Sequence, residues 1–236
     1  VFDRSLRYAE NHDEARIAGR GQWGNIGQDV GRPVSALLFS LSRGPVMLYS
    51  GQEVGEPADS AEGFGGDDAR TSIFDYWSMP ELAKWVNGKK FDGGRLSPEQ
   101  VSLRDFYSRL LRLLGEPAFQ NGGFFPLNPA NIENPHYGRV PGEQASGHWL
   151  YSLLRRDPAT GQRFLVVINL NPSRTFEDVR VKLPPAAWDF LGLKESSKIR
   201  LSDKLGTSDE IKSAASVLTL GSIPPLAAYF YEISEI

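Results

Sequence analysis

Two short stretches near the start of the chain decide the expected fold. Residues 9–16 read Ala-Glu-Asn-His-Asp-Glu-Ala-Arg, and residues 45–55 read Pro-Val-Met-Leu-Tyr-Ser-Gly-Gln-Glu-Val-Gly. In each stretch, polar residues directly follow a short apolar or extended run. Barrel enzymes carry their active sites in this way, at the carboxyl ends of their strands. The two stretches therefore predict two neighbouring barrel strands, over 5–10 and 46–49.

The segment between these strands has the pattern of a helix. Pro33 stands at a favoured first helical position, and the apolar run that follows stops at Ser42, just before Gly44-Pro45. The order strand, helix, strand is the repeating unit of a parallel sheet or barrel.

Composition is that of a globular protein and excludes several classes of function. The 236 residues are 40% hydrophobic and 23% charged, with a net charge of −3 and no cysteine. Without a basic stripe, nucleic acid is not expected as a partner, and without cysteine there are no disulfides or thiolate metal sites. The longest apolar stretch is too short for a membrane span, so no membrane is expected. The chain opens on Val-Phe-Asp without an initiator Met, so localisation stays unknown.

A second helix and a set of strands follow a long loop over 51–96. Ser97-Pro-Glu-Gln100 is a capping box, and apolar residues then recur at helical spacing up to Leu114, before Gly115 and Pro117. After about residue 118, short alternating runs separated by turn residues predict an antiparallel β-sandwich. The expected strands cover 149–154, 163–169, 176–183, 198–201, 216–220 and 227–233.

The sharpest chemical constellation is Asn11-His12-Asp13 at the end of the first expected strand. Asp13 supplies an anion, His12 a donor to sugar hydroxyls, and Arg16 a cation that orients either. Cleavage of a glycoside passes through an oxocarbenium-like state, which a neighbouring carboxylate stabilises. From these residues alone, an ordinary loop cap with a buried histidine explains the pattern equally well.

Both stretches resemble adjoining motifs of the alpha-amylase superfamily of glycoside hydrolases. Asn11-His12-Asp13-Glu14 is similar to the end of that family's seventh barrel strand. Gly44-Pro45, Tyr49, Gly51-Gln52-Glu53 and Gly55 resemble its eighth strand. The segments 75–77 and 103–111 look like the region up to the family's last helix, and an all-β domain follows in the family too. The resemblance implies an α/β plus all-β chain: residues 1–117 as strands 7 and 8 of a (β/α)8 barrel with their helices, and residues 118–236 as a C-terminal β-sandwich.

The resemblance also implies roles for single residues. Asp13 becomes the catalytic carboxylate that stabilises the transition state, and His12 binds substrate hydroxyls in the same subsite. Asn11 and Arg16 hold the loop and contribute to substrate binding. Tyr49, Gln52 and Glu53 are expected to be mainly structural. The substrate implied is an alpha-glucan or maltooligosaccharide, cleaved with retention.

This chain departs from the family pattern in its catalytic carboxylates. A retaining glycosidase needs a nucleophile and a separate acid/base roughly 5 Å apart. In the family these lie on the fourth and fifth strands, which nothing in the sequence supplies, and nothing suggests that Glu10, Glu14 or Glu53 replaces them. We therefore expect the chain alone to be inactive and its main partner to be the missing amino-terminal part of the barrel. Unpaired strand edges also predict self-association or partial disorder over 1–96.

Two other classes of function stay open. In one, the chain is a non-catalytic carbohydrate-binding or structural module, which glucan binding by residues 120–236 alone would favour. In the other, a metal phosphohydrolase, His12 and Asp13 would need further ligands, but His136 and His148 lie in the other expected domain.

The remaining motifs are weak. Gly19-x-Gly21-x-x-Gly24 matches a dinucleotide pattern in letters only. Gly65-Gly-Asp-Asp68 leaves a structural calcium as an alternative but lacks the ligand spacing of a calcium loop, so no metal or cofactor is expected. Aromatic side chains in and near the long loop are expected to pack, with sugar stacking as the alternative. They are Trp23, Phe74, Tyr76, Trp77 and Trp85.

Overall fold

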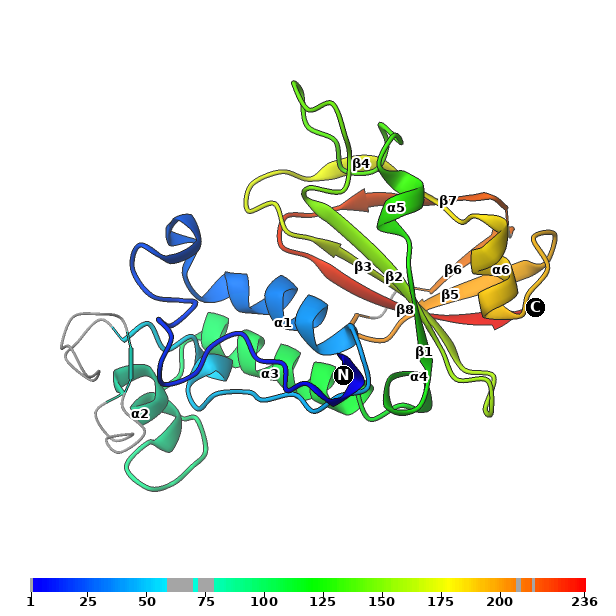
Figure 1. The fold of residues 1–236 in the computed structure, drawn as a ribbon. Coiled ribbons are helices and arrows are strands. Elements are labelled where there is room, and N and C mark those ends of the chain that lie inside the picture. The colour runs from blue at the N-terminus through cyan, green and yellow to red at the C-terminus, as the bar shows by residue number, and fades with distance from the viewer. Residues whose placement is uncertain (1, 59–69, 72–78, 207–208, 214) are drawn as a thin grey trace. The chain divides into compact units, whose positions relative to one another are not determined.

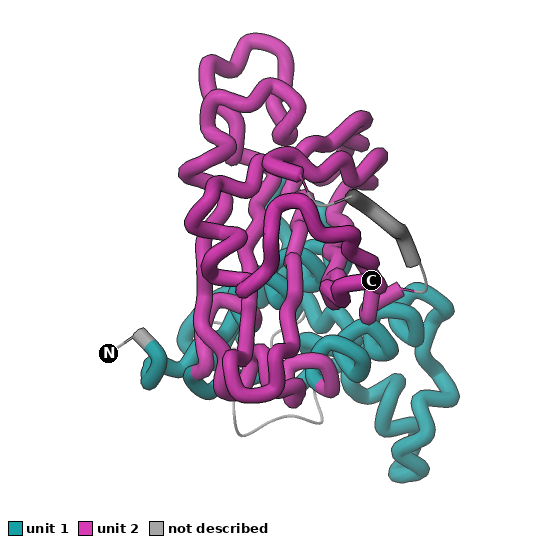
Figure 2. Tube along the Cα trace, turned by 90° about the vertical axis from the view of Figure 1, so that its right-hand side faces the viewer, with its two compact units in different colours: residues 1–39, 44–111 teal, residues 40–43, 112–236 magenta. Residues whose placement is uncertain are grey.

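The chain divides into two compact units. The computed structural model describes residues 2–58, 70–71, 79–206, 209–213 and 215–236. The first unit comprises residues 1–39 and 44–111, and the second comprises 40–43 and 112–236 (Figure 2). No helix in these described ranges is long and apolar enough to cross a bilayer.

The first unit is built mainly from helices and irregular chain (Figure 1). Its α-helices are α1 (Gly31–Ser40), α2 (Pro80–Val86) and α3 (Pro98–Leu113), the last residues of α1 and α3 being counted with the second unit. Short 3₁₀ helices cover Phe2–Arg4, Gln22–Asn25, Gly27–Val30 and Gln52–Val54. The helix predicted over 33–42 is confirmed as α1, which begins two residues earlier because Gly31 already has helical dihedral angles.

Helix α3 confirms the predicted capping box. The backbone N–H of Ser97 donates to Gln100 Oε1 at 3.0 Å, and the N–H of Gln100 donates to Ser97 Oγ at 3.3 Å. The predicted apolar face is buried at Leu103, Phe106, Tyr107, Leu110 and Leu114.

One residue of that predicted face differs in the structure. Leu111 was expected to be buried with the others but is 39% exposed. A helix turns by about 100° per residue, so Leu111 lies at the edge of the stripe that Leu103 and Leu110 define. On the opposite edge of the stripe Leu113, which was not predicted to be buried, is only 7% exposed, so the buried face of α3 is rotated toward Leu113 relative to the predicted one.

The two strands predicted over 5–10 and 46–49 are not regular strands. They meet in one isolated parallel bridge between Arg7 and Val46. The N–H of Arg7 donates to Pro45 O at 3.0 Å, and the N–H of Met47 donates to Arg7 O at 2.9 Å. Parallel sheets are stable when further strands flank them and both faces are covered. Among the described residues no other segment extends this pairing, which explains why the ladder stops after one bridge.

The second unit contains the β-structure. A six-stranded sheet has the order β1-β2-β3-β8-β5-β6, and a two-stranded sheet pairs β4 with β7 (Figure 1). Every pairing in both sheets is antiparallel. The strands are β1 (Gly123–Pro126), β2 (Leu150–Arg156), β3 (Arg163–Asn169), β4 (Phe176–Lys182), β5 (Lys198–Asp203), β6 (Asp209–Ser213), β7 (Val217–Ile223) and β8 (Ala228–Glu235). The helices are α4 (Pro117–Gln120), α5 (Asn128–Asn131) and α6 (Pro185–Leu191).

One hydrophobic core joins the two sheets, which confirms the predicted β-sandwich. Leu165 and Val167 of the larger sheet and Val179 and Leu220 of the smaller one belong to the same buried cluster. Helix α6 adds Trp188 to it. The six predicted strands correspond to β2, β3, β4, β5, β7 and β8. The elements of the second unit that were not predicted are β1, β6, α4, α5 and α6, and in the first unit α2 lies within the segment predicted as a long loop over 51–96.

Strand β3 is buried on both faces. Alternate residues such as Leu165 and Val167 face the sandwich core, while Phe164 and Val166 between them are buried as well. Phe119 of α4 packs against Phe164, with ring centroids 5.0 Å apart. This two-sided burial explains why the sequence of β3 is an almost continuous apolar run.

Candidate functional site

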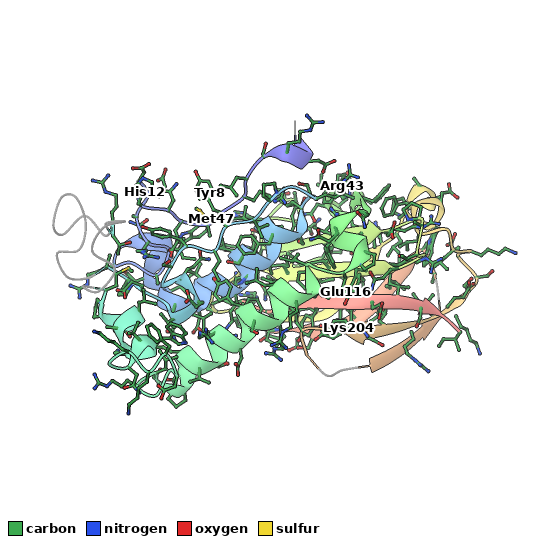
Figure 3. All side chains as sticks on the ribbon, turned by 90° about the horizontal axis from the view of Figure 1, so that it is seen from below. Tyr8, His12, Arg43, Met47, Glu116 and Lys204 are labelled. Atoms are coloured by element: carbon green, nitrogen blue, oxygen red, sulfur yellow. The ribbon has the colours of Figure 1, made fainter. Side chains whose placement is uncertain are left out.

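The Asn11-His12-Asp13 segment forms a tight turn that exposes its acidic side chain. Asn11 Oδ1 accepts hydrogen bonds from the N–H groups of Asp13 at 2.8 Å and Glu14 at 2.9 Å. An asparagine that bonds to the backbone two and three residues later stabilises such a turn. The Asp13 side chain is 71% exposed, and its Oδ2 lies 3.5 Å from His12 Nε2. His12, 39% exposed, lies at the surface of the first unit (Figure 3).

A buried ion pair closes the base of this turn. Arg16 Nη1 lies 2.5 Å from Glu10 Oε1, and both side chains are almost completely buried. The other carboxylate oxygen of Glu10 accepts a hydrogen bond from the N–H of Ile17 at 2.8 Å. Glu10 precedes the turn and Arg16 follows it, so the pair fixes the distance between the two ends of the loop.

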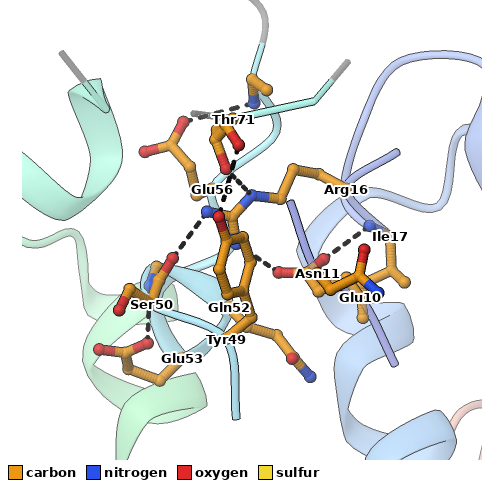
Figure 4. A network of polar contacts seen from close by, with 12 residues as sticks. Glu10, Asn11, Arg16, Ile17, Tyr49, Ser50, Gln52, Glu53, Glu56 and Thr71 are labelled. Carbon is orange, nitrogen blue, oxygen red and sulfur yellow. Dashed lines mark hydrogen bonds and ion pairs between the residues drawn. The ribbon is translucent and has the colours of Figure 1, made fainter. Parts of the chain in front are cut away.

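Arg16 also connects the turn to segments that are distant in sequence (Figure 4). Its Nη2 donates to Ser50 O at 2.7 Å, and its Nε donates to Thr71 Oγ1 at 3.0 Å. The guanidinium carbon lies 4.3 Å from the centre of the Tyr49 ring, in cation–π contact. The guanidinium of Arg16 thus makes its contacts inside the protein, and the side chain is buried. Arg16 therefore positions the loop and does not reach solvent.

The contacts of Arg16 with Tyr49 and Ser50 also join the second predicted stretch to the first. Tyr49 lies against Arg16, and its hydroxyl donates to Thr71 O at 3.4 Å. Gln52 is buried, and its Nε2 donates to Ser35 Oγ at 2.9 Å and to Tyr107 Oη at 2.8 Å. Glu53 accepts a hydrogen bond from the N–H of Gly51 at 3.0 Å. These contacts agree with a structural role for Tyr49, Gln52 and Glu53.

Glu56 is a buried carboxylate that sequence reasoning missed. Its Oε2 accepts hydrogen bonds from the N–H groups of Glu81 at 2.9 Å and Leu82 at 3.1 Å, in the first turn of α2. The residue before α2 is Met79, which provides no side-chain cap, so Glu56 satisfies these donors from a distant part of the chain. In the sequence, Met79 before Pro80 cannot cap a helix with its side chain, which indicates that α2 needs a cap from elsewhere. The sequence does not indicate which residue provides that cap.

Burial changes the acidity of both internal carboxyls. Burial raises the pKa of Glu10 above its ordinary value, and the neighbouring Arg16 guanidinium opposes this rise. Burial likewise raises the pKa of Glu56, against the effect of its hydrogen bonds from Leu82, Glu81 and Ala58. Neither carboxyl is available to solvent, because both are engaged inside the unit.

The other motifs add no ligand set. Gly21 and Gly24 have left-handed dihedral angles around a short 3₁₀ turn, which is not the strand-to-helix junction of a dinucleotide site. Within the described ranges, no three or more histidine, cysteine or acidic side chains gather into a metal site. The calcium alternative at 65–68 and the aromatic residues Phe74, Tyr76 and Trp77 lie outside the described residues.

The two remaining aromatic candidates differ from each other. Trp85 packs with Leu96 against a buried cluster of Val54, Met79 and Leu82. Trp23 is 54% exposed, at a backbone position with φ of 46°. Packing therefore accounts for Trp85, whereas Trp23 presents its ring to solvent.

Taken together, the second unit is an all-β sandwich and the first unit carries an exposed carboxylate on a braced turn. Residues 144–234 match the family model described as the alpha-amylase C-terminal all-beta domain. This match and the solved structures described next confirm the predicted resemblance to the alpha-amylase superfamily of glycoside hydrolases. A search of curated protein sequences finds no match to the chain.

Solved enzymes of this kind have a similar fold. An alpha-amylase from Geobacillus thermoleovorans, solved with acarbose, aligns with a TM-score of 0.59 and 15% identity over 98% of this chain and 39% of its own. A noncanonic maltogenic alpha-amylase from Thermotoga neapolitana aligns with a TM-score of 0.56 and 16% identity, over 97% of this chain and 41% of its own. The trehalose-6-phosphate hydrolase of Bacillus licheniformis gives a TM-score of 0.56 and 13% identity, covering 98% of this chain and 43% of its own. The chain thus spans about two fifths of the length of these structures, and at this identity they establish the fold alone.

Proposed function

We propose that this chain is the carboxyl-terminal part of an alpha-amylase-like glycoside hydrolase that acts on alpha-glucans or maltooligosaccharides with retention. Residues 1–117 would complete a (β/α)8 barrel as its strands 7 and 8, and residues 118–236 would form its C-terminal β domain. The parallel bridge between Arg7 and Val46 and the intervening helix α1 support the barrel assignment.

The observation that carries the proposal is the exposed Asp13 carboxylate on its braced turn. The side chain is 71% exposed with His12 beside it, while Asn11 and the Glu10–Arg16 pair hold the backbone beneath it. In the proposed mechanism, the Asp13 carboxylate stabilises positive charge as the sugar ring becomes oxocarbenium-like. His12 donates a hydrogen bond to a hydroxyl of the same sugar unit.

Asp13 alone cannot complete a retaining reaction. One carboxylate must attack the anomeric carbon while a second group protonates the leaving oxygen. Glu10 is unsuited to either task because Arg16 and Ile17 occupy both of its oxygens. We therefore propose that the nucleophile and the acid/base come from the rest of the barrel and that the chain alone is inactive.

The test is hydrolysis of maltooligosaccharides, first by this chain and then by this chain joined to the barrel part of an alpha-amylase. The chain alone should give no reducing sugar. In the joined protein, Asp13→Asn should lower kcat by about 10²–10³, as loss of a transition-state contact does, with little change in KM. Glu14→Gln, which changes the neighbouring exposed carboxylate, is the matched control. Turnover by the chain alone that Asp13→Ala abolishes would refute the proposal.

A further inference from the structure

The second unit carries a pocket that the proposed function does not use. Its volume is about 590 Å³, and it lies between α5 and the loop over 143–148. The side chains that matter for its chemistry are Asn128, Pro129, Ile132, Glu143, Gln144 and His148. The recess is wide open to solvent, so it would cover one side of a bound molecule and leave the other side hydrated.

The walls of this pocket are held by hydrogen bonds within the second unit. Ser146 N–H donates to Ile132 O at 2.7 Å, and Ser146 Oγ donates to Asn134 O at 2.6 Å. Arg139 Nε donates to Ser146 Oγ at 3.0 Å. These bonds tie the loop to the chain that follows α5, so the pocket exists before any ligand arrives.

His148 presents a fixed aromatic ring at the pocket. Its ring lies parallel to that of Trp149, with centroids 4.7 Å apart and planes 5° apart. Its Nδ1 lies 3.3 Å from Glu143 Oε1, and the side chain is 70% exposed.

The lining combines these polar groups with apolar surface. Ile132 is 47% exposed, and Pro129 lies beside it in the pocket wall. Glu143 already accepts a hydrogen bond from the N–H of Val140 at 2.9 Å. None of the described residues that line the pocket is Lys or Arg, so a phosphorylated or other anionic ligand is not favoured.

We propose that this pocket binds a glucosyl unit of an alpha-glucan, as a non-catalytic holding site. The proposal rests on the proposed function for its choice of sugar. A pyranose has an apolar C–H face and a rim of hydroxyls. The lining offers apolar surface at Ile132 and Pro129 for the former and polar groups at His148, Gln144 and Glu143 for the latter. Such a site would keep a long substrate attached to the β domain.

The experiment measures binding of maltoheptaose to the full chain by calorimetry. His148→Ala should weaken binding at least 5-fold. The matched control is His136→Ala, because His136 is also a partly exposed histidine paired with a carboxylate, Asp178, but it lies outside the pocket. Circular dichroism would verify that each variant folds. Asp13→Asn is included to separate this pocket from the proposed catalytic loop.

Each outcome decides the proposal. Loss of binding in His148→Ala, with binding kept in His136→Ala and Asp13→Asn, would support it. Binding lost in Asp13→Asn but kept in His148→Ala would overturn it and leave the proposed function standing. Absence of maltoheptaose binding, or equal binding of cellohexaose, would overturn it too, whereas the proposed function is judged separately by turnover of the joined protein.

Discussion

Arg16 and Glu10 form a buried ion pair, with Nη1 and Oε1 2.5 Å apart, directly beneath the turn that carries Asp13. The pair holds the two ends of the loop together, because Glu10 precedes residues 11–14 and Arg16 follows them. The same guanidinium donates to the carbonyl oxygen of Ser50, within the second stretch that resembles the barrel family. Arg16 therefore joins both stretches in the first unit.

Replacing Arg16 should destabilise the first unit strongly. Arg16→Met leaves the buried Glu10 carboxylate without its cation, and loss of one member of a buried pair typically costs about 3–5 kcal/mol. Urea unfolding followed by tryptophan fluorescence measures this loss. Arg95→Met, at an exposed arginine, is the control. Equal stability of the two variants would contradict the role assigned to Arg16.

Gly51 should not tolerate a side chain. Its φ is +93°, and an added Cβ would lie 2.9 Å from the Cβ of Glu56. Gly51→Ala should therefore lower the free energy of unfolding by about 1–3 kcal/mol from backbone strain, and by more from the clash. Gly88→Ala is a matched control, since Gly88 also has a positive φ, +65°, but no atom within 4 Å of the added Cβ. The two variants should differ in thermal unfolding, and identical melting temperatures would rule out the clash.

Glu56 should make the first unit less stable as the pH rises. Burial raises its pKa in the folded protein, so the folded state binds the proton more tightly than the unfolded chain does. The free energy of unfolding should then fall from the ordinary carboxyl pKa, about 4.3, up through the raised value. Glu56→Gln removes this titration and should weaken the dependence, and the part that remains comes from Glu10, whose pKa burial also raises. Glu14→Gln, which changes an exposed carboxylate, is the control. Unfolding measured at a series of pH values upward from about 4, near the ordinary carboxyl pKa, provides the test.

Asn169 should be essential to the sandwich. Its buried Nδ2 donates to Arg174 O at 3.0 Å, Ile223 O at 3.2 Å and Pro224 O at 2.8 Å. Asn169→Ala should cost about 1–3 kcal/mol, because it removes the hydrogen bonds that this buried amide makes to three backbone carbonyls. Asn169→Asp should cost more, since a carboxylate oxygen would face the same carbonyls. Fluorescence of the buried Trp188 reports the unfolding, and a stable Asn169→Asp variant would contradict this account.

The sequence predicted the regular parts of the fold where the pattern is local. The capping box at Ser97 and Gln100 and the alternation in β4 need only neighbouring residues to be recognised, and both predictions are confirmed. Strands β1 and β6 were missed because each is short and lies at an edge of the larger sheet. The expected strands around Arg7 and Val46 form one bridge, because pairing depends on neighbours and not only on the apolar run.

In the candidate site too, contacts between neighbouring residues could be predicted from the sequence, whereas contacts between distant residues could not. A loop cap at Asn11 with a buried histidine was one of two interpretations of the sequence; the cap is present, but His12 is 39% exposed. The partners of Arg16 at Ser50 and Thr71 and the cap that Glu56 gives to α2 join residues far apart in the chain. No local pattern encodes such contacts. The catalytic role of Asp13 stays a prediction.

Asn128 lines the pocket on the second unit, and hydrogen bonds from the interior of that unit hold its side chain in place. Its Oδ1 accepts hydrogen bonds from Tyr137 Oη at 2.7 Å and from the N–H of Ser152 at 2.9 Å, and Tyr137 is fully buried. The amide is thereby part of the same rigid body as the sandwich interior. The Asn128 side chain is therefore already ordered before a ligand binds in this pocket. Binding should cost little conformational entropy at Asn128, so its contribution to the binding enthalpy should come from direct contacts with the ligand.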